Sequence, residues 1–207
     1  IKILVSSTNY ADYTITVTVT VAAKDTQTIT ASNIRATYGD TGVKVNATAV
    51  GALNYSVISG DDVIDIDASG NVTIKKAGEA TIKISAAETN DYAAATKDIT
   101  VTIAKRTLTV KAADKSAYIG EKLPELTYEV SGLVGSDKLT KEPTLEVKHA
   151  ADVDPMKKVG EYEIGFKVAP AASANYELTT ATGKLTVSVR PVYVGPIGSP
   201  VEVGRSD

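Results

Sequence analysis

The chain has 207 residues, a formal net charge of −3 and no cysteine. The slightly acidic balance argues against a nucleic-acid partner, because such a partner requires a basic face that displaces counterions from phosphates. The lack of cysteine excludes disulfides and cysteine-ligated zinc. No apolar run is long enough to cross a bilayer, and no signal peptide opens the chain, so we expect no membrane insertion in this segment. A start at Ile1 rather than Met fits a fragment whose targeting signals lie elsewhere.

The residue types favour β-strands. Thr, Val, Ile and Ala dominate, Trp is absent and Phe166 is the single Phe. β-Branched side chains pack well on a pleated, half-buried surface.

Strict alternation of apolar and polar residues marks the expected strands in chain order. The clearest stretch is 14–21, where Ile15, Val17, Val19 and Val21 are predicted to face inward and the threonines outward. Further strands are expected at 72–74, 81–84, 99–103, 108–110, 162–166 and 185–189. Residues 67–71 (Asp-Ala-Ser-Gly-Asn) predict a turn between two strands. Residues 133–139 are the one place where we expect a short helical turn, because Leu133, Val134 and Leu139 could share a face.

The chain repeats itself, which is the sign of tandem units. Residues 75–79 (Lys-Lys-Ala-Gly-Glu) return as 157–161 (Lys-Lys-Val-Gly-Glu), an offset of 82. Tyr92 returns as Tyr176, an offset of 84, and the strand 99–103 returns as 185–189, an offset of 86. Residues 54–57 likewise resemble 127–130, which pairs Tyr55 with Tyr128. The N-terminus fits the same series, since 1–3 matches 82–84 and Asn9-Tyr10 matches Asp91-Tyr92.

These offsets predict four segments. Residues 1–22 form the last hairpin of a truncated preceding unit, 23–105 one full unit and 106–190 a second, and 191–207 a linker or disordered tail. The second unit carries about ten extra residues between its Ser-Gly and Lys-Lys pairs. The joint at 103–108 is short, which predicts an elongated rod.

The fold class expected from this pattern is all-β, with tandem immunoglobulin-like β-sandwich units. For the second unit, a β-grasp-like sheet around one short helix stays open as an alternative.

With these residues in view, the chain resembles the tandem repeat domains of bacterial surface and adhesin-like proteins. The first unit resembles a bacterial immunoglobulin-like domain of group 2, through residues 55–57, 65–67, 70–73 and 76–82. The second resembles an MBG-type repeat, through residues 108–110, 118–120, 126–133, 160–162, 175–176 and 183–187. The resemblance implies export, attachment to the cell surface or cell wall, and a spacer or adhesive role, and it carries over no catalytic residue.

Candidate chemistry is sparse. His149 is the only histidine, so a Ser-His-Asp or similar device would have to use it. Its polar surroundings, 148–152, favour a surface loop instead. We therefore predict no catalytic residues, no cofactor and no enzymatic activity.

The densest acidic group offers a metal alternative. Asp61, Asp62 and Asp65 are the calcium candidates, because oxygen-rich clusters can hold calcium. Their spacing is not that of an EF-hand, and a solvated strand face that also carries Asp67 is the simpler interpretation.

Three other patterns favour structural roles. Gly39, Gly42, Gly132 and Gly135 lack the strand and helix of a phosphate loop and are predicted to be turn glycines. The recurring tyrosines favour packing over a sugar-binding platform. An isopeptide bond from a lysine such as Lys83 or Lys111 is conceivable, but the sequence does not single one out.

The leading hypothesis is a non-catalytic spacer, monomeric in isolation, that holds another domain away from the cell. One alternative is an adhesive module that binds host protein or glycan through loops or an exposed sheet edge. The other is a set of accessory domains of an extracellular multidomain enzyme.

Overall fold

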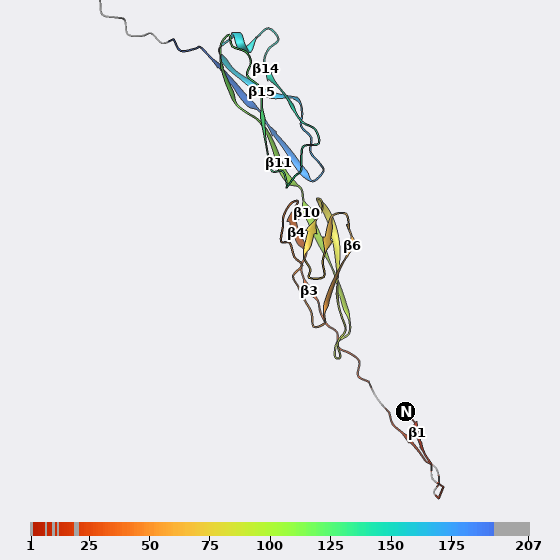
Figure 1. The fold of residues 1–207 in the computed structure, drawn as a ribbon. Helices are drawn as coiled ribbons and strands as arrows, with labels where there is room; N and C mark the ends of the chain where they lie inside the picture. Colours follow the sequence, from red (N-terminus) through yellow and green to blue (C-terminus); the bar gives the residue numbers. More distant parts are fainter. Residues whose placement is uncertain (1, 7, 10, 12, 19–20, 193–207) are drawn as a thin grey trace, which may run out of the picture. The chain divides into compact units, whose positions relative to one another are not determined.

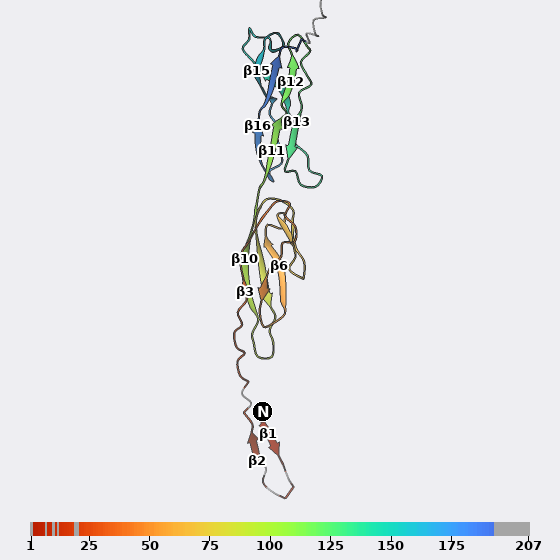
Figure 2. The ribbon, with the colours of Figure 1, turned by 90° about the vertical axis from the view of Figure 1, so that its left-hand side faces the viewer.

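The protein is described by a computed structural model, which covers residues 2–6, 8, 9, 11, 13–18 and 21–192 (Figures 1 and 2). It divides into two compact units: residues 1–36 with 40–103, and residues 37–39 with 104–207. The predicted tail lies almost wholly outside the described residues. No helix in the described part of the chain is long and apolar enough to cross a membrane.

The N-terminal segment forms the predicted hairpin. β1 (Lys2–Val5) pairs antiparallel with β2 (Tyr13–Thr16), so that Ile3 lies opposite Ile15. The inward orientation predicted for this strand is wrong where it can be checked, because Ile15 and Val17 are 43% and 41% exposed and Val21 is 86% exposed. The physical reason is that, among the described residues, β2 pairs with β1 alone, and a two-stranded sheet by itself cannot bury an apolar face.

Apart from the N-terminal hairpin, the described strands of the first unit form three sheets. The main sheet has the order β4-β10-β9-β6. It is formed by β4 (Ile34–Thr37), β6 (Leu53–Ser59), β9 (Gly78–Ala86) and β10 (Ala95–Ala104). Two small pairs accompany it: β3 (Thr30–Ala31) with β5 (Ala47–Thr48), and β7 (Ile64–Ile66) with β8 (Val72–Ile74).

Alternation places the core of this unit. β9 and β10 bury every second side chain, and their inner faces supply Ala80, Ile82, Ile84, Ala86, Ile99, Val101 and Ile103. The turn predicted at 67–71 is confirmed, since it joins β7 to β8 with Gly70 at a φ of +81°.

The second unit is a sandwich of two sheets. One has the order β13-β11-β16 and the other β12-β17-β15-β14. The strands are β11 (Arg106–Ala112), β12 (Lys115–Tyr118), β13 (Tyr128–Ser131), β14 (Thr144–Lys148), β15 (Gly160–Val168), β16 (Tyr176–Ala181) and β17 (Gly183–Ser188). Its core cluster consists of Ala112, Ile164, Leu185 and Val187, with Leu108 and Val110 also buried.

The short helix expected at 133–139 is wrong. This segment contains a turn at 135–136 but no helix, with Gly135 at a φ of +55°. A single 3₁₀ turn, η1 (Pro155–Lys157), forms instead, because Pro155 fits the first helical position and the Asp154 side chain caps it. The β-grasp alternative fails with it, since the described residues contain no α-helix.

The two units share one strand order, and this corrects part of the repeat alignment. β4, β10, β9 and β6 of the first unit correspond to β12, β17, β15 and β14 of the second. β6 therefore corresponds to β14, so the predicted pairing of Tyr55 with Tyr128 is wrong: Tyr55 lies on β6, whereas Tyr128 lies on β13. The sequence match failed because the extra residues of the second unit precede β14.

The register also shows which offset is structural. Gly78 lies opposite Ile103 in the first unit, and Gly160 lies opposite Val187 in the second. Ile103 thus corresponds to Val187, the same offset of 84 that relates Tyr92 to Tyr176. The offset of 86, which came from comparing strand compositions, shifts the last strand of the second unit by two residues. The error arises because an alternating strand shifted by two residues keeps the same residues facing inward.

The Tyr92 and Tyr176 positions mark a shared junction. The Asp25 N–H donates to the Asp91 carbonyl at 2.7 Å, and the Arg106 N–H donates to the Asn175 carbonyl at 3.0 Å. In the first unit, Asp25 forms an isolated parallel bridge with Tyr92, and in the second, β11 pairs parallel with β16, with Arg106 opposite Tyr176. The recurrence of Asp/Asn-Tyr reflects this joint of the sandwich.

Candidate functional site

The acidic group of the first unit is paired with lysines. Lys75 Nζ lies 2.7 Å from Asp65 Oδ1 and donates to the Asp61 carbonyl at 2.7 Å, while Lys76 forms an ion pair with Asp62. The hydrogen bond from Lys76 lowers the pKa of Asp62. Within the described residues, no three His, Asp or Glu side chains gather closely enough for a metal. Calcium binding by Asp61, Asp62 and Asp65 stays a prediction, and a cation there would compete with two ammonium groups.

Asp67 organises the β7–β8 turn. Its Oδ1 accepts from the backbone N–H groups of Ser69 and Asn71 at 2.8 and 2.9 Å, and its Oδ2 accepts from Asn71 Nδ2 at 2.8 Å. These hydrogen bonds, led by the Asn71 side chain, lower the pKa of Asp67. The Asp67 carboxylate therefore caps the turn, which explains why one of the four aspartates in this acidic group is present.

His149 lies directly after β14, at the mouth of a hollow in the second unit. Its Nδ1 lies 2.8 Å from the Ala150 carbonyl, so this nitrogen carries the hydrogen and Nε2 accepts in the neutral ring. The ring is exposed, as predicted for a surface histidine. Sequence reasoning did not anticipate that it borders a cavity.

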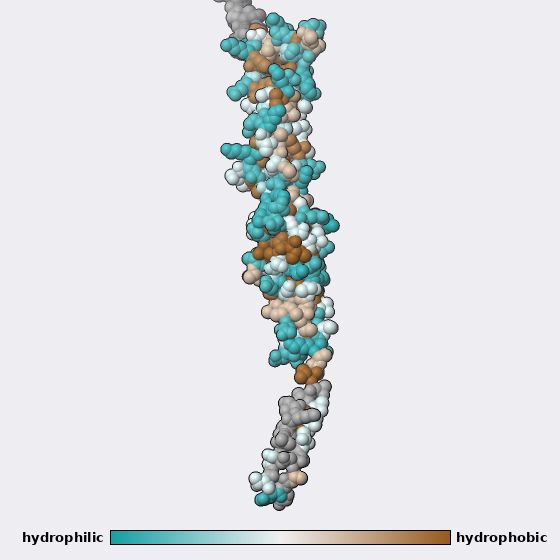
Figure 3. All heavy atoms as spheres, turned by 90° about the vertical axis from the view of Figure 1, so that its right-hand side faces the viewer, coloured by the Kyte–Doolittle hydropathy of each residue, from teal (hydrophilic) through white to brown (hydrophobic). Residues whose placement is uncertain are grey.

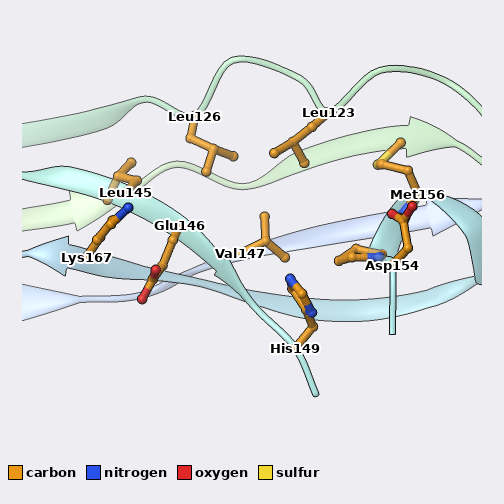
Figure 4. A pocket seen from close by; sticks show the side chains of 10 residues that line it. Leu123, Leu126, Leu145, Glu146, Val147, His149, Asp154, Met156 and Lys167 are labelled. Atoms are coloured by element: carbon orange, nitrogen blue, oxygen red, sulfur yellow. The ribbon is translucent and has the colours of Figure 1, made fainter. Parts of the chain in front are cut away.

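The hollow has an apolar floor and charged ends (Figure 4). Its volume is about 400 Å³, within the range of small-ligand pockets. Leu126, Leu145, Val147 and Met156 line it and also pack against the core cluster. The hollow therefore opens onto the sandwich core, and Leu123, which also lines it, is 47% exposed.

Asp154 and His149, the polar groups at one end of this hollow, form hydrogen bonds and ion pairs with neighbouring residues of their own loop rather than with each other. Asp154 Oδ1 accepts from the Met156 N–H at 3.0 Å, and its Oδ2 lies 3.4 Å from Lys157 Nζ. No hydrogen bond joins Asp154 to His149 among the described contacts. The geometry can hold an amphipathic ligand, but it contains no base paired with an orienting acid, as nucleophilic catalysis requires.

A pair of tyrosines, the buried Tyr176 and the half-buried Tyr38, forms a second polar cluster within the second unit. Tyr176 Oη donates to Asp137 Oδ2 at 2.6 Å and accepts from the Val134 N–H at 2.9 Å, and Tyr38 Oη donates to the same oxygen at 3.0 Å. The two rings meet edge to face with centroids 5.5 Å apart. Burial, followed by the hydrogen bond to Asp137, raises the pKa of both phenols. Every group has a partner, so the cluster is structural, and it fixes the extra segment of this unit.

Gln27 is a further structural residue that the sequence did not reveal. Its side chain is 8% exposed, and its Nε2 donates to the Ala87 and Ala93 carbonyls, both at 2.8 Å. Its Oε1 accepts from the Gly51 N–H at 2.9 Å. A single glutamine in a threonine-rich stretch carries no periodic signal, so nothing in the pattern predicted this role.

The remaining predicted positions are unremarkable in the structure. Gly39, Gly42, Gly132 and Gly135 all have positive φ, which confirms them as turn glycines. Lys83 lies opposite Asp98 and Lys111 opposite Glu129 in the sheet registers, and neither lysine is buried.

Comparison with known proteins identifies the second unit. Residues 108–186 match the family model of the MBG domain (YGX type), which confirms the resemblance stated for this unit. The match covers less than half of the chain, and the immunoglobulin-like assignment of the first unit stays a prediction. No curated protein matches the sequence.

Solved structures resemble the chain only distantly. Domains 4 and 5 of the S-layer protein SbsC are 14% identical with a TM-score of 0.32, over 81% of this chain and 100% of that one. A SusE-like surface-located polysaccharide-binding protein from Bacteroides thetaiotaomicron is 15% identical with a TM-score of 0.29, over 79% of this chain and 34% of that one. Fibronectin(III)-like modules of CbhA from Clostridium thermocellum are 16% identical with a TM-score of 0.27, over 78% of this chain and 95% of that one. Likeness at this level carries no argument about function.

Proposed function

We propose that the chain is a non-catalytic spacer segment of a bacterial cell-surface protein, exported and attached to the envelope through other parts of its parent. The observation that carries the proposal is that one strand order is repeated in two successive units. Such repetition is typical of arrays in which each unit adds length rather than a new site.

The connection between the units supports a spacer role. β10 ends at Ala104 and β11 begins at Arg106, so Lys105 alone separates the two strands. A linker of one residue has few backbone torsions available for bending, in contrast to a long Gly/Ser linker. A spacer needs this property, because a freely jointed chain does not hold a distal domain at a fixed reach.

Small-angle X-ray scattering tests the proposal. We expect the wild-type chain to give an extended distance distribution, and a variant with ten Gly/Ser residues inserted after Lys105 to give a broader one. A compact wild-type particle would contradict the spacer role. Hydrolase activity of the wild-type chain that is lost in His149→Ala would contradict the non-catalytic assignment.

A further inference from the structure

The hollow beside β14 borders the inner face of this strand and also reaches its edge. Leu145, Glu146 and Val147 all line it, although successive residues of a strand point to opposite faces. Because Glu146 lines the cavity together with its two neighbours, the cavity extends past the inner face to the edge of the strand. Figure 4 shows Leu123 and Leu126 on one side of this hollow, and Val147 of β14 and His149, which follows β14, on the other.

This edge has unpaired backbone groups. β14 is the outermost strand of its sheet, and β15 is its one strand neighbour among the described residues. An edge strand presents a row of N–H and C=O groups that can pair with another extended chain. At β14, that row borders an apolar cavity, so backbone pairing and side-chain burial are available to the same ligand.

The two ends of the hollow carry opposite charge. Lys167 lies beside Leu145 at one end, whereas Asp154 and the His149 ring lie at the other, as Figure 4 shows. Lys167 forms no ion pair among the described contacts. Glu146 alternates with Leu145 and Val147, and in Figure 4 it projects away from Leu123 and Leu126. A ligand lying along β14 therefore meets a cation, an apolar middle and then the Asp154 carboxylate, whose Oδ2 lies 3.4 Å from the exposed Lys157 ammonium.

The spacing of these groups matches an extended peptide. From Leu145 to His149 is four residues, which is roughly 13 Å along a strand. Side chains at alternate positions of an added strand share one face. The first and fifth residues of the peptide would therefore meet the two charged ends of the hollow, and the third would meet its apolar middle. Antiparallel pairing is the more stable arrangement, and it places the peptide's basic residue before its acidic one.

We propose that the free edge of β14 binds an extended peptide as an added antiparallel strand, with a basic, an aliphatic and an acidic side chain at alternate positions. The aliphatic side chain fills the hollow, the basic one lies beside Asp154 and His149, and the acidic one lies beside Lys167. This is β-strand addition, in which the backbone supplies affinity and the pocket supplies specificity. The proposal does not depend on the spacer role, because a spacer with or without this site has the same fold.

The test measures binding of a fluorescein-labelled peptide, Thr-Lys-Thr-Leu-Thr-Glu-Thr, to the full chain by fluorescence anisotropy. Its matched control exchanges the Lys and the Glu. We expect the first peptide to bind more tightly by about fivefold, the size of one to two exposed charge pairs. Equal affinity for the two peptides, or no saturable binding of the first, would overturn the proposal.

Two surface variants locate the site. Leu123→Lys places a charge at the mouth of the hollow, whereas Ile58→Lys does the same on β6 of the first unit. The two residues are 47% and 48% exposed, so the two variants should disturb the fold to a similar degree. We expect Leu123→Lys to weaken binding at least tenfold and Ile58→Lys to leave it unchanged, while both keep the wild-type melting temperature. Binding that is insensitive to Leu123→Lys would sink the assignment.

Charge reversal and amide exchange complete the test. Lys167→Glu should weaken binding of the first peptide and restore it for Thr-Lys-Thr-Leu-Thr-Lys-Thr. Hydrogen exchange of the β14 amides should slow in the complex, since strand addition engages them directly. Unchanged exchange of the β14 amides would show that the peptide binds the hollow in another mode and would refute strand addition. Self-association of the chain without peptide, abolished by Leu123→Lys, would assign the hollow to a second copy and would also refute the proposal.

Discussion

At the scale of single residues, Asp67 shows how an exposed carboxylate can contribute to stability. Its pKa is lowered because the folded turn donates three hydrogen bonds to the charged form. Such a group stabilises the fold above the ordinary pKa of aspartate, and the contribution disappears as pH falls through the lowered value. We predict that Asp67→Ala melts at a lower temperature than wild type at pH 7, and that the gap closes on acidification. Asp61→Ala in metal-free buffer is the control, and a gap that persists in acid would contradict the explanation.

Tyr176 gives the opposite pH dependence. Burial and the hydrogen bond to Asp137 raise its pKa, so the neutral phenol is the stabilising form. Its contribution is complete below the pKa of an unfolded tyrosine and is lost as pH rises through the higher folded value. Tyr176→Phe leaves the Val134 N–H and Asp137 each without one partner. It should therefore cost about 1–3 kcal/mol in urea unfolding at pH 7. Tyr55→Phe, on the other unit, is expected to be nearly neutral.

At the scale of elements, Gln27 connects the segment before β3 to the loops that border β6, β9 and β10 of the main sheet. It joins the first strand region of its unit to the loop at Gly51 and to both ends of the connection between β9 and β10. A Cβ on Gly51 would lie 1.9 Å from the Ala87 carbonyl oxygen, so this approach is too close for any other residue. Gln27→Leu should cost about 2–3 kcal/mol, because it leaves a buried N–H and two carbonyls unsatisfied. Denaturant unfolding measures this cost, and Thr28→Ala, at the exposed neighbouring position, should change little.

Sequence patterns predicted the strands and turns that are determined by residues close together in the chain. β8, β9, β10, β11, β15 and β17 all lie where alternation or a matching repeat indicated strands, because one buried face imposes a period of two residues. The turn at 67–71 was likewise predicted from Asp, Gly and Asn. These features depend only on neighbouring residues, which is why a single sequence reveals them.

Features that depend on distant partners were not predictable. The segment at 133–139 has helical spacing, yet Val134 and Asp137 are held by Tyr176, which lies about forty residues further on. The hollow beside β14 is invisible in sequence, because its lining comes from four separate segments whose proximity only the fold creates. The same holds for His149, whose loop composition predicted exposure but not the adjoining cavity.

At the scale of the whole molecule, each unit has its own core. Ile82 on β9 is fully buried in the first unit, and Leu185 is fully buried in the second, within the cluster of Ala112, Ile164 and Val187. Removing either side chain to Ala should cost about 2–5 kcal/mol, through lost burial and a residual cavity. For a unit of this size, that corresponds to a fall in melting temperature of roughly 10 °C or more.

The two substitutions therefore test whether the units unfold independently. Differential scanning calorimetry of the wild-type chain is expected to resolve into two transitions. Ile82→Ala should lower one of them and Leu185→Ala the other, and the double variant should show both shifts unchanged, because effects at separate cores add. A single transition that both substitutions lower equally would mean that the units fold as one cooperative body, and the description of two separate cores would then be wrong.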